Sequence, residues 1–143
     1  IYGRTHTRDI NKLGGLMKVL PFIGAIYVIT GLAYLGLPGF SGFVAEMNIF
    51  VGAFENPNMF HRVLTILAVS SIVVTAVYIL RLVGKIMMGP LANEEFKDLP
   101  KATWFEKTGI LLLLIPIIAM GVAPLWLSDM IRASLEPFIK GVL

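Results

Sequence analysis

Uncharged and mostly apolar stretches alternate with short polar segments along this sequence. The uncharged stretches are residues 19–45, 63–80 and 108–128, and the first continues beyond Glu46 to Phe54. About 20 apolar residues are needed for a helix to cross the roughly 30 Å hydrocarbon core of a bilayer. The second and third stretches therefore predict membrane helices at 62–88 and 108–128, and Pro116 and Pro124 predict kinks in the latter.

The first stretch is interrupted near its middle, where residues 35–42 read LGLPGFSG. This composition disfavours a continuous helix. The residues that interrupt it are Gly36, Pro38, Gly39 and Gly42. Two arrangements are compatible with the interruption: a re-entering pair of short helices, or a single crossing made of two half-helices joined by unwound backbone.

The distribution of Lys and Arg distinguishes these arrangements. A pair of crossings divides the 12 basic residues seven against five, whereas a single interrupted crossing places nine on one side and three on the other. The second division is what the positive-inside rule expects. We therefore predict one discontinuous crossing over residues 19–54, with residues 1–18 as a cytoplasmic loop.

The segment 129–143 differs from the apolar stretches. Apolar residues share one face of a helix here, while Arg132, Glu136 and Lys140 recur every fourth residue on another. The apolar face consists of Ile131, Leu135, Phe138, Ile139 and Val142. The pattern predicts a short interfacial helix distorted by Pro137. The predicted fold is all-α, with three membrane crossings, the first discontinuous, and this C-terminal interfacial helix.

Composition supports a membrane protein. Hydrophobic residues make up 57% of the chain, charged residues 15%, and the mean hydropathy is +0.82. The absence of cysteine excludes a disulfide, a thiolate zinc site or an iron–sulfur cluster bound by these residues. The net charge of +3 is spread along the chain, which does not indicate nucleic-acid binding. The polar start without Met suggests a piece of a longer protein.

Glu46 is the acidic residue within a predicted membrane segment, four residues after Gly42. An ionised carboxylate is costly in hydrocarbon, so Glu46 is expected to be protonated part of the time, paired, or facing a water-filled cavity. This is the chemistry of a proton relay. The alternative is that the half-helix is short and Glu46 reaches an interface.

Other polar residues give weaker indications. Ser71, Thr75 and Tyr78 form a polar line on one face of the second predicted helix, suited to binding water or to bonding a neighbouring helix. His6 and His61 have no second ligand at a metal-binding spacing, and the sequence contains no nucleotide-binding glycine motif.

Three segments resemble a known family. They are YGRTHTRDINKLGGL near the start, LGLPGFSGFVAEMNIFVGAF around Glu46, and VVTAVYILR at residues 73–81. They are similar to the antiporter-like membrane subunits of respiratory complex I, the NADH:quinone oxidoreductase, and most of all to the C-terminal end of the chain M type, called chain 4 in mitochondria.

The resemblance implies a role for each matched feature. LGLPGFSG matches a discontinuous helix of the family, and Glu46 matches a glutamate at the outlet end of a proton pathway whose other charged residues lie on earlier helices. The three crossings correspond to the twelfth, thirteenth and fourteenth helices, with the RTHTR loop cytoplasmic. The redox reaction is then carried out by the whole complex, with flavin, iron–sulfur clusters and quinone in partner subunits and no cofactor in this chain.

The resemblance also implies the partners and the membrane of this chain, and it leaves other functions open. The expected partners are the other membrane-arm subunits and the lipid bilayer, and a bacterial inner membrane is preferred to the mitochondrial one. A multi-subunit cation/proton antiporter or a membrane-bound hydrogenase shares the fold and similar motifs. A third reading is a structural segment without a part in transport.

Overall fold

The computed structural model describes the backbone of residues 1–142 and the side chains of residues 1–136, and within these ranges all regular structure is helical. This confirms the all-α prediction. The longer helices are α2 (Pro21–Tyr34), α3 (Ser41–Phe54), α4 (Met59–Met87), α5 (Trp104–Val122) and α6 (Leu125–Val142). The shorter ones are α1 (Tyr2–Thr5), η1 (Ile10–Lys12), η2 (Leu16–Lys18) and η3 (Glu94–Asp98).

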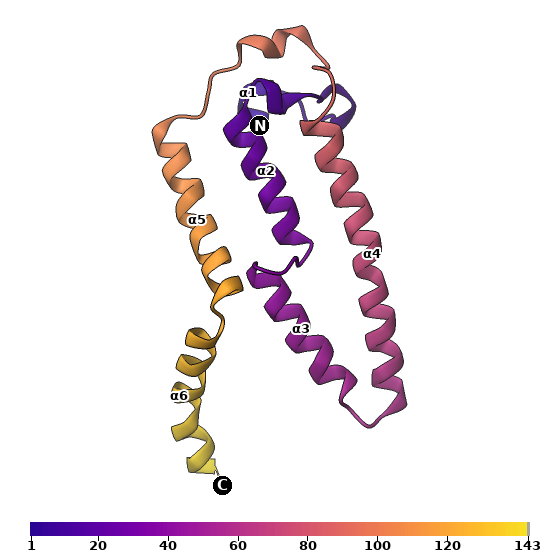
Figure 1. Cartoon of the computed structure of the whole chain (residues 1–143), viewed down its shortest axis with the longest axis vertical. Helices are drawn as coiled ribbons and strands as arrows, with labels where there is room; N and C mark the ends of the chain where they lie inside the picture. The colour runs from indigo at the N-terminus through magenta and orange to yellow at the C-terminus, as the bar shows by residue number, and fades with distance from the viewer. Residues whose placement is uncertain (143) are drawn as a thin grey trace.

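The first crossing is discontinuous, as predicted. Helices α2 and α3 run in the same direction on either side of residues 35–40, and α4 returns antiparallel beside both (Figure 1). A re-entering pair would instead reverse direction at the break. The structure therefore agrees with a single interrupted crossing.

Helix α4 forms the returning crossing. It begins at Met59, three residues earlier than the sequence predicted. The side chain of the preceding residue, Asn58, caps the helix by accepting a hydrogen bond from the Phe60 amide at 3.0 Å. Its 29 residues give a length of about 43 Å. Helices α4 and α5 are the two described helices that are each long and apolar enough to span a membrane.

Helix α5 and its continuation differ from the predicted span at 108–128. Thr103 and Glu106 form a capping box that starts α5 at Trp104. The helix continues through Pro116 but ends at Val122, because Pro124 lacks an amide hydrogen and forces Ala123 out of the helical region (φ −130°, ψ 66°).

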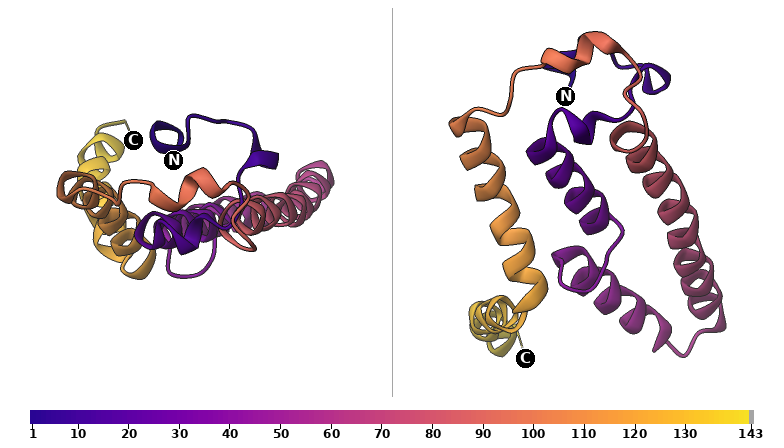
Figure 2. Two further views of the ribbon diagram at one scale, coloured as in Figure 1. Left: turned by 90° about the horizontal axis from the view of Figure 1, so that it is seen from above. Right: turned by 45° about the horizontal axis from the view of Figure 1, so that its top comes forward.

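Helix α6 lies where the sequence predicted a short interfacial helix over residues 129–143. It begins at Leu125 and its backbone is helical through Pro137, where the sequence predicted a distortion. In the right-hand view of Figure 2, α6 is seen nearly end-on while α5 is seen from the side, so the two helices are not collinear. The side chains of Phe138, Ile139, Lys140 and Val142 lie outside the described residues, and the interfacial position of α6 stays a prediction.

A small core lies where the N-terminal segment covers the end of α4. Its buried residues are Leu13, Leu16, Ile86, Met87 and Phe96. Two backbone hydrogen bonds join the segments beside it, from the Gly15 amide to the Met88 carbonyl at 3.1 Å and from the Ala92 amide to the Gly14 carbonyl at 3.3 Å. We name this assembly of residues 1–18, the end of α4 and η3 the N-terminal cluster.

Arg4 connects the N-terminal cluster to α5. Its guanidinium donates to the Pro100 carbonyl at 2.7 Å and to the Glu106 carboxylate at 2.6 Å, and its side chain is 14% exposed. The same carboxylate accepts from the Thr103 amide at 2.7 Å. The Glu106 side chain thus caps the start of α5 and, through Arg4, holds it beside the N-terminal cluster.

We expect Arg4→Gln to lower the midpoint of thermal unfolding of the chain within its solubilised native complex by a few degrees, because several charge-assisted hydrogen bonds are lost together. Lys97→Ala is the control, since the Lys97–Glu94 pair is 60% and 91% exposed and such pairs contribute little. Equal midpoints for the two variants would show that Arg4 does not hold α5.

Candidate functional site

The break between α2 and α3 is a turn that requires glycine. Gly36 has φ +63° and Gly39 has φ +100°, and only glycine adopts such angles without steric cost. Within the turn the Gly36 amide donates to the Ala33 carbonyl, and the Phe40 amide donates to the Leu37 carbonyl, both at 3.2 Å. Pro38 lies between the two glycines and prevents the helix from continuing.

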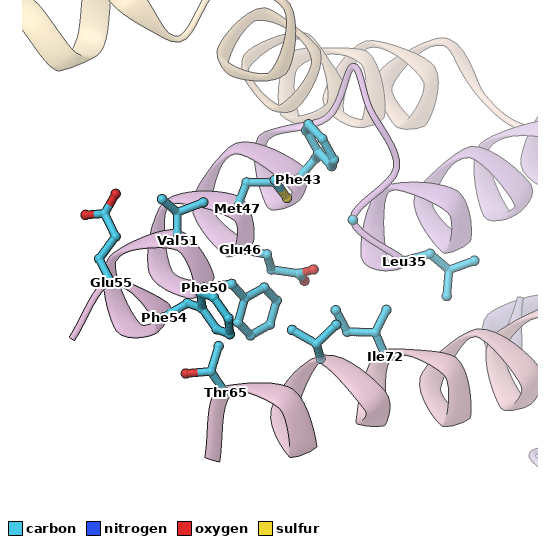
Figure 3. Close-up of a pocket in the computed structure, with 12 residues that line it drawn as sticks. Leu35, Phe43, Glu46, Met47, Phe50, Val51, Phe54, Glu55, Thr65 and Ile72 are labelled. Atoms are coloured by element: carbon cyan, nitrogen blue, oxygen red, sulfur yellow. The ribbon is translucent and has the colours of Figure 1, made fainter. Parts of the chain in front are cut away.

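Glu46 lies directly over this turn. Side chains on a helix lean toward its N-terminal end, so Glu46 on α3 is directed back to the break, as Figure 3 shows. A Cβ atom added to Gly36 would lie 2.6 Å from Glu46 Oε2. The predicted break and the predicted relay carboxyl therefore form one site, and the Glu46 side chain is half-buried there.

Two grooves of different character meet at Glu46. The first, of about 560 Å³, lies between α3 and α4 and is lined mainly by apolar side chains (Figure 3). These side chains include Phe43, Met47, Phe50, Phe54, Val69 and Ile72. The second, of about 670 Å³, lies on the side of α2 and carries hydroxyl groups. These hydroxyls belong to Thr30, Tyr34, Ser41, Ser71 and Thr75. We name them the apolar groove and the hydroxyl groove.

The predicted polar line on α4 is only partly at the site. Ser71 and Thr75 line the hydroxyl groove together with Glu46, whereas Tyr78 does not line it. The phenol of Tyr78 instead interacts with that of Tyr34, which stands at the end of α2 and does line the groove. Gly42 closes the site from α3, where a Cβ atom would lie 3.2 Å from the Ala33 carbonyl oxygen.

Sequence reasoning missed two residues of this site. Tyr34 was not distinguished from the apolar residues around it. Gly121 of α5 lies so close to the break that an added Cβ would overlap the backbone of Gly39 and Phe40. The signal for Gly121 was a glycine in an otherwise bulky apolar run, but only the fold shows which backbone approaches it.

The histidines lie away from this site. His6 follows α1 in the N-terminal cluster beside Tyr2, and His61 is in the first turn of α4 beside Phe60. Among the described residues, no group of three His, Cys, Asp or Glu side chains is placed to bind a metal ion.

Comparison with known proteins gives consistent matches. The model of the family described as "NADH:quinone oxidoreductase/Mrp antiporter, TM" matches residues 1–75. The chain is 34% identical to NAD(P)H-quinone oxidoreductase chain 4 2 of Synechococcus sp. (strain JA-3-3Ab), over 96% of the chain and 27% of that protein. It is 32% identical to NADH-quinone oxidoreductase subunit M of Rickettsia felis, over 97% of the chain and 27% of that protein.

A solved structure agrees in fold. A chain of respiratory complex I from Thermus thermophilus with bound NADH matches with a TM-score of 0.74 and 30% identity, over 86% of this chain and 25% of that one. The chain thus spans about a quarter of the length of its relatives.

The broken crossing, the apolar helices and these matches define an integral membrane protein of antiporter-like fold. The chain belongs to the NADH:quinone oxidoreductase/Mrp antiporter transmembrane family.

We expect Gly36→Ala to displace the Glu46 carboxyl from the turn, because the new methyl group would occupy its position. Gly39→Ala is the control, since its Cβ meets no atom within 4 Å, while its φ of +100° makes the backbone strain of an alanine at least as large as at Gly36. Labelling of Glu46 by a hydrophobic carbodiimide, read by mass spectrometry, should change several-fold in Gly36→Ala and little in Gly39→Ala. Equal labelling in the two variants would contradict the contact.

We expect Gly121→Ala to reduce the amount of the protein in the membrane and its thermal midpoint, because α5 must move away from the break to accommodate a methyl group. Gly109→Ala on the same helix should have little effect, since its Cβ meets no atom within 4 Å. Quantitative immunoblotting and heat-induced precipitation in detergent measure both. A tolerated Gly121→Ala would show that the close approach of α5 is dispensable.

Proposed function

We propose that this chain is the C-terminal part of a proton-translocating membrane subunit, of the chain M type, in an NADH:quinone oxidoreductase. The observation that carries the proposal is the Glu46 carboxyl seated on a helix break, with its oxygen within 2.6 Å of where a Gly36 Cβ would lie. Unwound backbone at membrane depth recurs in ion transporters, where it surrounds the transported ion. The similarity to chain 4 and subunit M proteins supports this assignment.

The break offers hydrogen-bonding partners to both protonation states of Glu46. No side chain caps α3, so amides of its first turn are available to a carboxylate. The carbonyls of Gly31, Leu32 and Ala33 at the end of α2 accept from the amides of Leu35 and Gly36, and each keeps a second lone pair that can accept from the O–H of a carboxylic acid. A proton can therefore be taken up and released at one place without a large rearrangement, which is what a relay residue requires.

Transport of this kind depends on the rest of the complex. Charge movements in neighbouring helices, begun by the distant quinone reaction, would alternately favour uptake and release at Glu46. The other relay residues belong to earlier helices, outside these 143 residues. Flavin, iron–sulfur clusters and quinone are assigned to partner subunits, so that the complex and not this chain carries out the redox chemistry.

The topology follows from the same proposal. Residues 1–18 and 81–107 share the cytoplasmic side, with the membrane-arm subunits and lipid as neighbours. The bilayer is assigned to a bacterial inner membrane. The second candidate, a subunit of a cation/proton antiporter or membrane-bound hydrogenase, is favoured by one observation: the matching family includes Mrp antiporters.

We expect Glu46→Gln in the full-length protein to abolish most proton translocation and to lower coupled quinone reduction, because an amide cannot carry the proton. Glu55→Gln is the matched control: Glu55 is the exposed C-cap residue of α3 and lines the apolar groove at the end away from the break, so this variant should resemble the wild type. NADH-driven acidification of inverted vesicles, normalised to assembled complex on a native gel, provides the measurement.

Wild-type translocation by an assembled Glu46→Gln complex would refute the relay role. Sodium-dependent transport without NADH oxidation would favour the antiporter instead. Loss of assembly alone, with unchanged translocation per complex, would favour a structural role.

A further inference from the structure

A small pocket lies between the start of α2 and the start of α5, at the end of each helix that is away from the break. Its volume is about 130 Å³. Its apolar wall consists of Leu20, Pro21, Phe22 and Ile23, and its basic residues are Lys101 and Lys107. We name it the lysine pocket, and we infer that it binds the head group of an anionic phospholipid, with the two lysines paired to the phosphate.

The lining of the lysine pocket divides in the same way as a phospholipid. The apolar wall comes from the first turn of α2, which begins at Pro21, and the positive charges come from α5 and the segment before it. In a phospholipid the charged phosphate adjoins the glycerol esters and the apolar acyl chains. A free phosphate ion would leave the apolar wall unused, so the combination favours a lipid.

The protein does not neutralise the charges of these two lysines. Within the part of the chain whose side chains are described, the ion pairs are Arg4–Glu106 and Lys97–Glu94, and neither includes Lys101 or Lys107. Glu106 is the neighbour of Lys107 in sequence, but its carboxylate is bonded to Arg4 and caps α5. Two ammonium groups are therefore available to a phosphate, to which they form charge-assisted hydrogen bonds.

The position of Lys107 in α5 directs it to the pocket. It is the fourth residue of the helix, and helical side chains lean toward the N-terminal end, so its ammonium group is carried toward the membrane surface. Lys107 Nζ lies 5.6 Å from the centre of the Phe22 ring on α2. This cation–π contact joins the two helices across the pocket. The ammonium group thus lies over the apolar wall on which an acyl chain would rest.

The backbone that carries Lys101 is held by Arg4. The Arg4 guanidinium donates to the Pro100 carbonyl at 2.7 Å and to the Lys101 carbonyl at 3.4 Å. These bonds fix a segment that has no helical hydrogen bonds of its own. Both sides of the lysine pocket are therefore formed before a ligand binds, and binding requires the ordering of two lysine side chains and little else.

The lysine pocket lies at the depth of lipid head groups. Trp104, the first residue of α5, is 75% exposed, and exposed tryptophan is concentrated at the membrane–water interface. Lys107 is the last charged residue before the uncharged remainder of α5. Both helices start at the end of the molecule that carries the N-terminal cluster (Figure 1). In the proposed topology this end is cytoplasmic, where the membrane surface carries anionic lipids and basic pockets between helices bind their head groups.

The test uses the full-length protein in its assembled complex, reconstituted in vesicles of phosphatidylcholine with a small fraction of photoactivatable phosphatidylglycerol. After illumination, mass spectrometry locates lipid adducts on the peptides of this protein. We expect adducts at residues 20–23 and 101–107. Their yield per assembled complex should fall several-fold in the double variant Lys101→Gln/Lys107→Gln, because the amides carry no charge to pair with the phosphate.

Lys12→Gln/Lys97→Gln is the matched control. It removes the same charge from the same end of the protein, at two exposed residues that do not line the lysine pocket. Its adduct yield should equal that of the wild type. The variant Lys101→Arg/Lys107→Arg keeps both charges and should also be labelled as the wild type is. A several-fold loss in this arginine variant would contradict a role of charge.

The choice of lipid distinguishes head-group binding from contact with acyl chains. A photoactivatable phosphatidylcholine with the same chains should give several-fold fewer adducts at the pocket, since its choline cancels the phosphate charge. Equal labelling by the two lipids, equal labelling of the glutamine variant and its control, or an absence of adducts from the pocket would each overturn the inference.

Inorganic phosphate, added in place of chloride at equal ionic strength, should leave the adducts unchanged. Their loss would assign the two lysines to a free anion and overturn the choice of a lipid. None of these measurements depends on proton transfer at Glu46, so a failure of this inference is distinguishable from a failure of the proposed function.

Discussion

Six residues of non-helical backbone, at 35–40, set the main constraint on this structure. In hydrocarbon, backbone amides and carbonyls without partners are costly, so such a segment persists only where protein or a polar cavity surrounds it. The chain meets this requirement from two sides. Helix α4 runs beside both half-helices, and α5 crosses the break at Gly121, so close that no side chain fits between the two backbones.

The same break explains the position of the Glu46 carboxyl beside the turn. A break leaves amides without intrahelical partners at the start of one helix, beside carbonyls of the preceding helix that each keep a second lone pair, and a carboxyl group can use both. Because the Glu46 side chain leans toward the start of α3, it reaches the turn at Gly36. A residue one position earlier or later along α3 would point about 100° around the helix and away from the turn.

Local composition was enough to predict the break and the carboxyl beside it, because glycine, proline and an isolated charge act through their own backbone and solvation. The charge distribution then distinguished one crossing from two, since topology depends on counts and not on contacts. The end of α5 was harder to predict from the sequence. Whether Pro116 or Pro124 ends a helix depends on neighbours, and the structure continues through the first and stops before the second.

Residues that act across helices could not be found from the sequence. Tyr34 and Gly121 belong to the site only because α4 and α5 approach the break, and no local pattern specifies that approach. Likewise, the spacing of Ser71, Thr75 and Tyr78 places them on one face of α4, but the groove contains only the first two. A helical periodicity identifies a shared face, whereas the neighbouring helix decides which part of that face it covers.

Helix α5 links the break to the N-terminal cluster. Glu106 at its start is bonded to Arg4, and Gly121 near its end touches the break. These positions are about 22 Å apart along the helix axis. Helix α5 is continuous between them and passes through Pro116. It therefore joins the break, where Glu46 lies, to the opposite end of the crossing, which is the end that carries most of the positive charge.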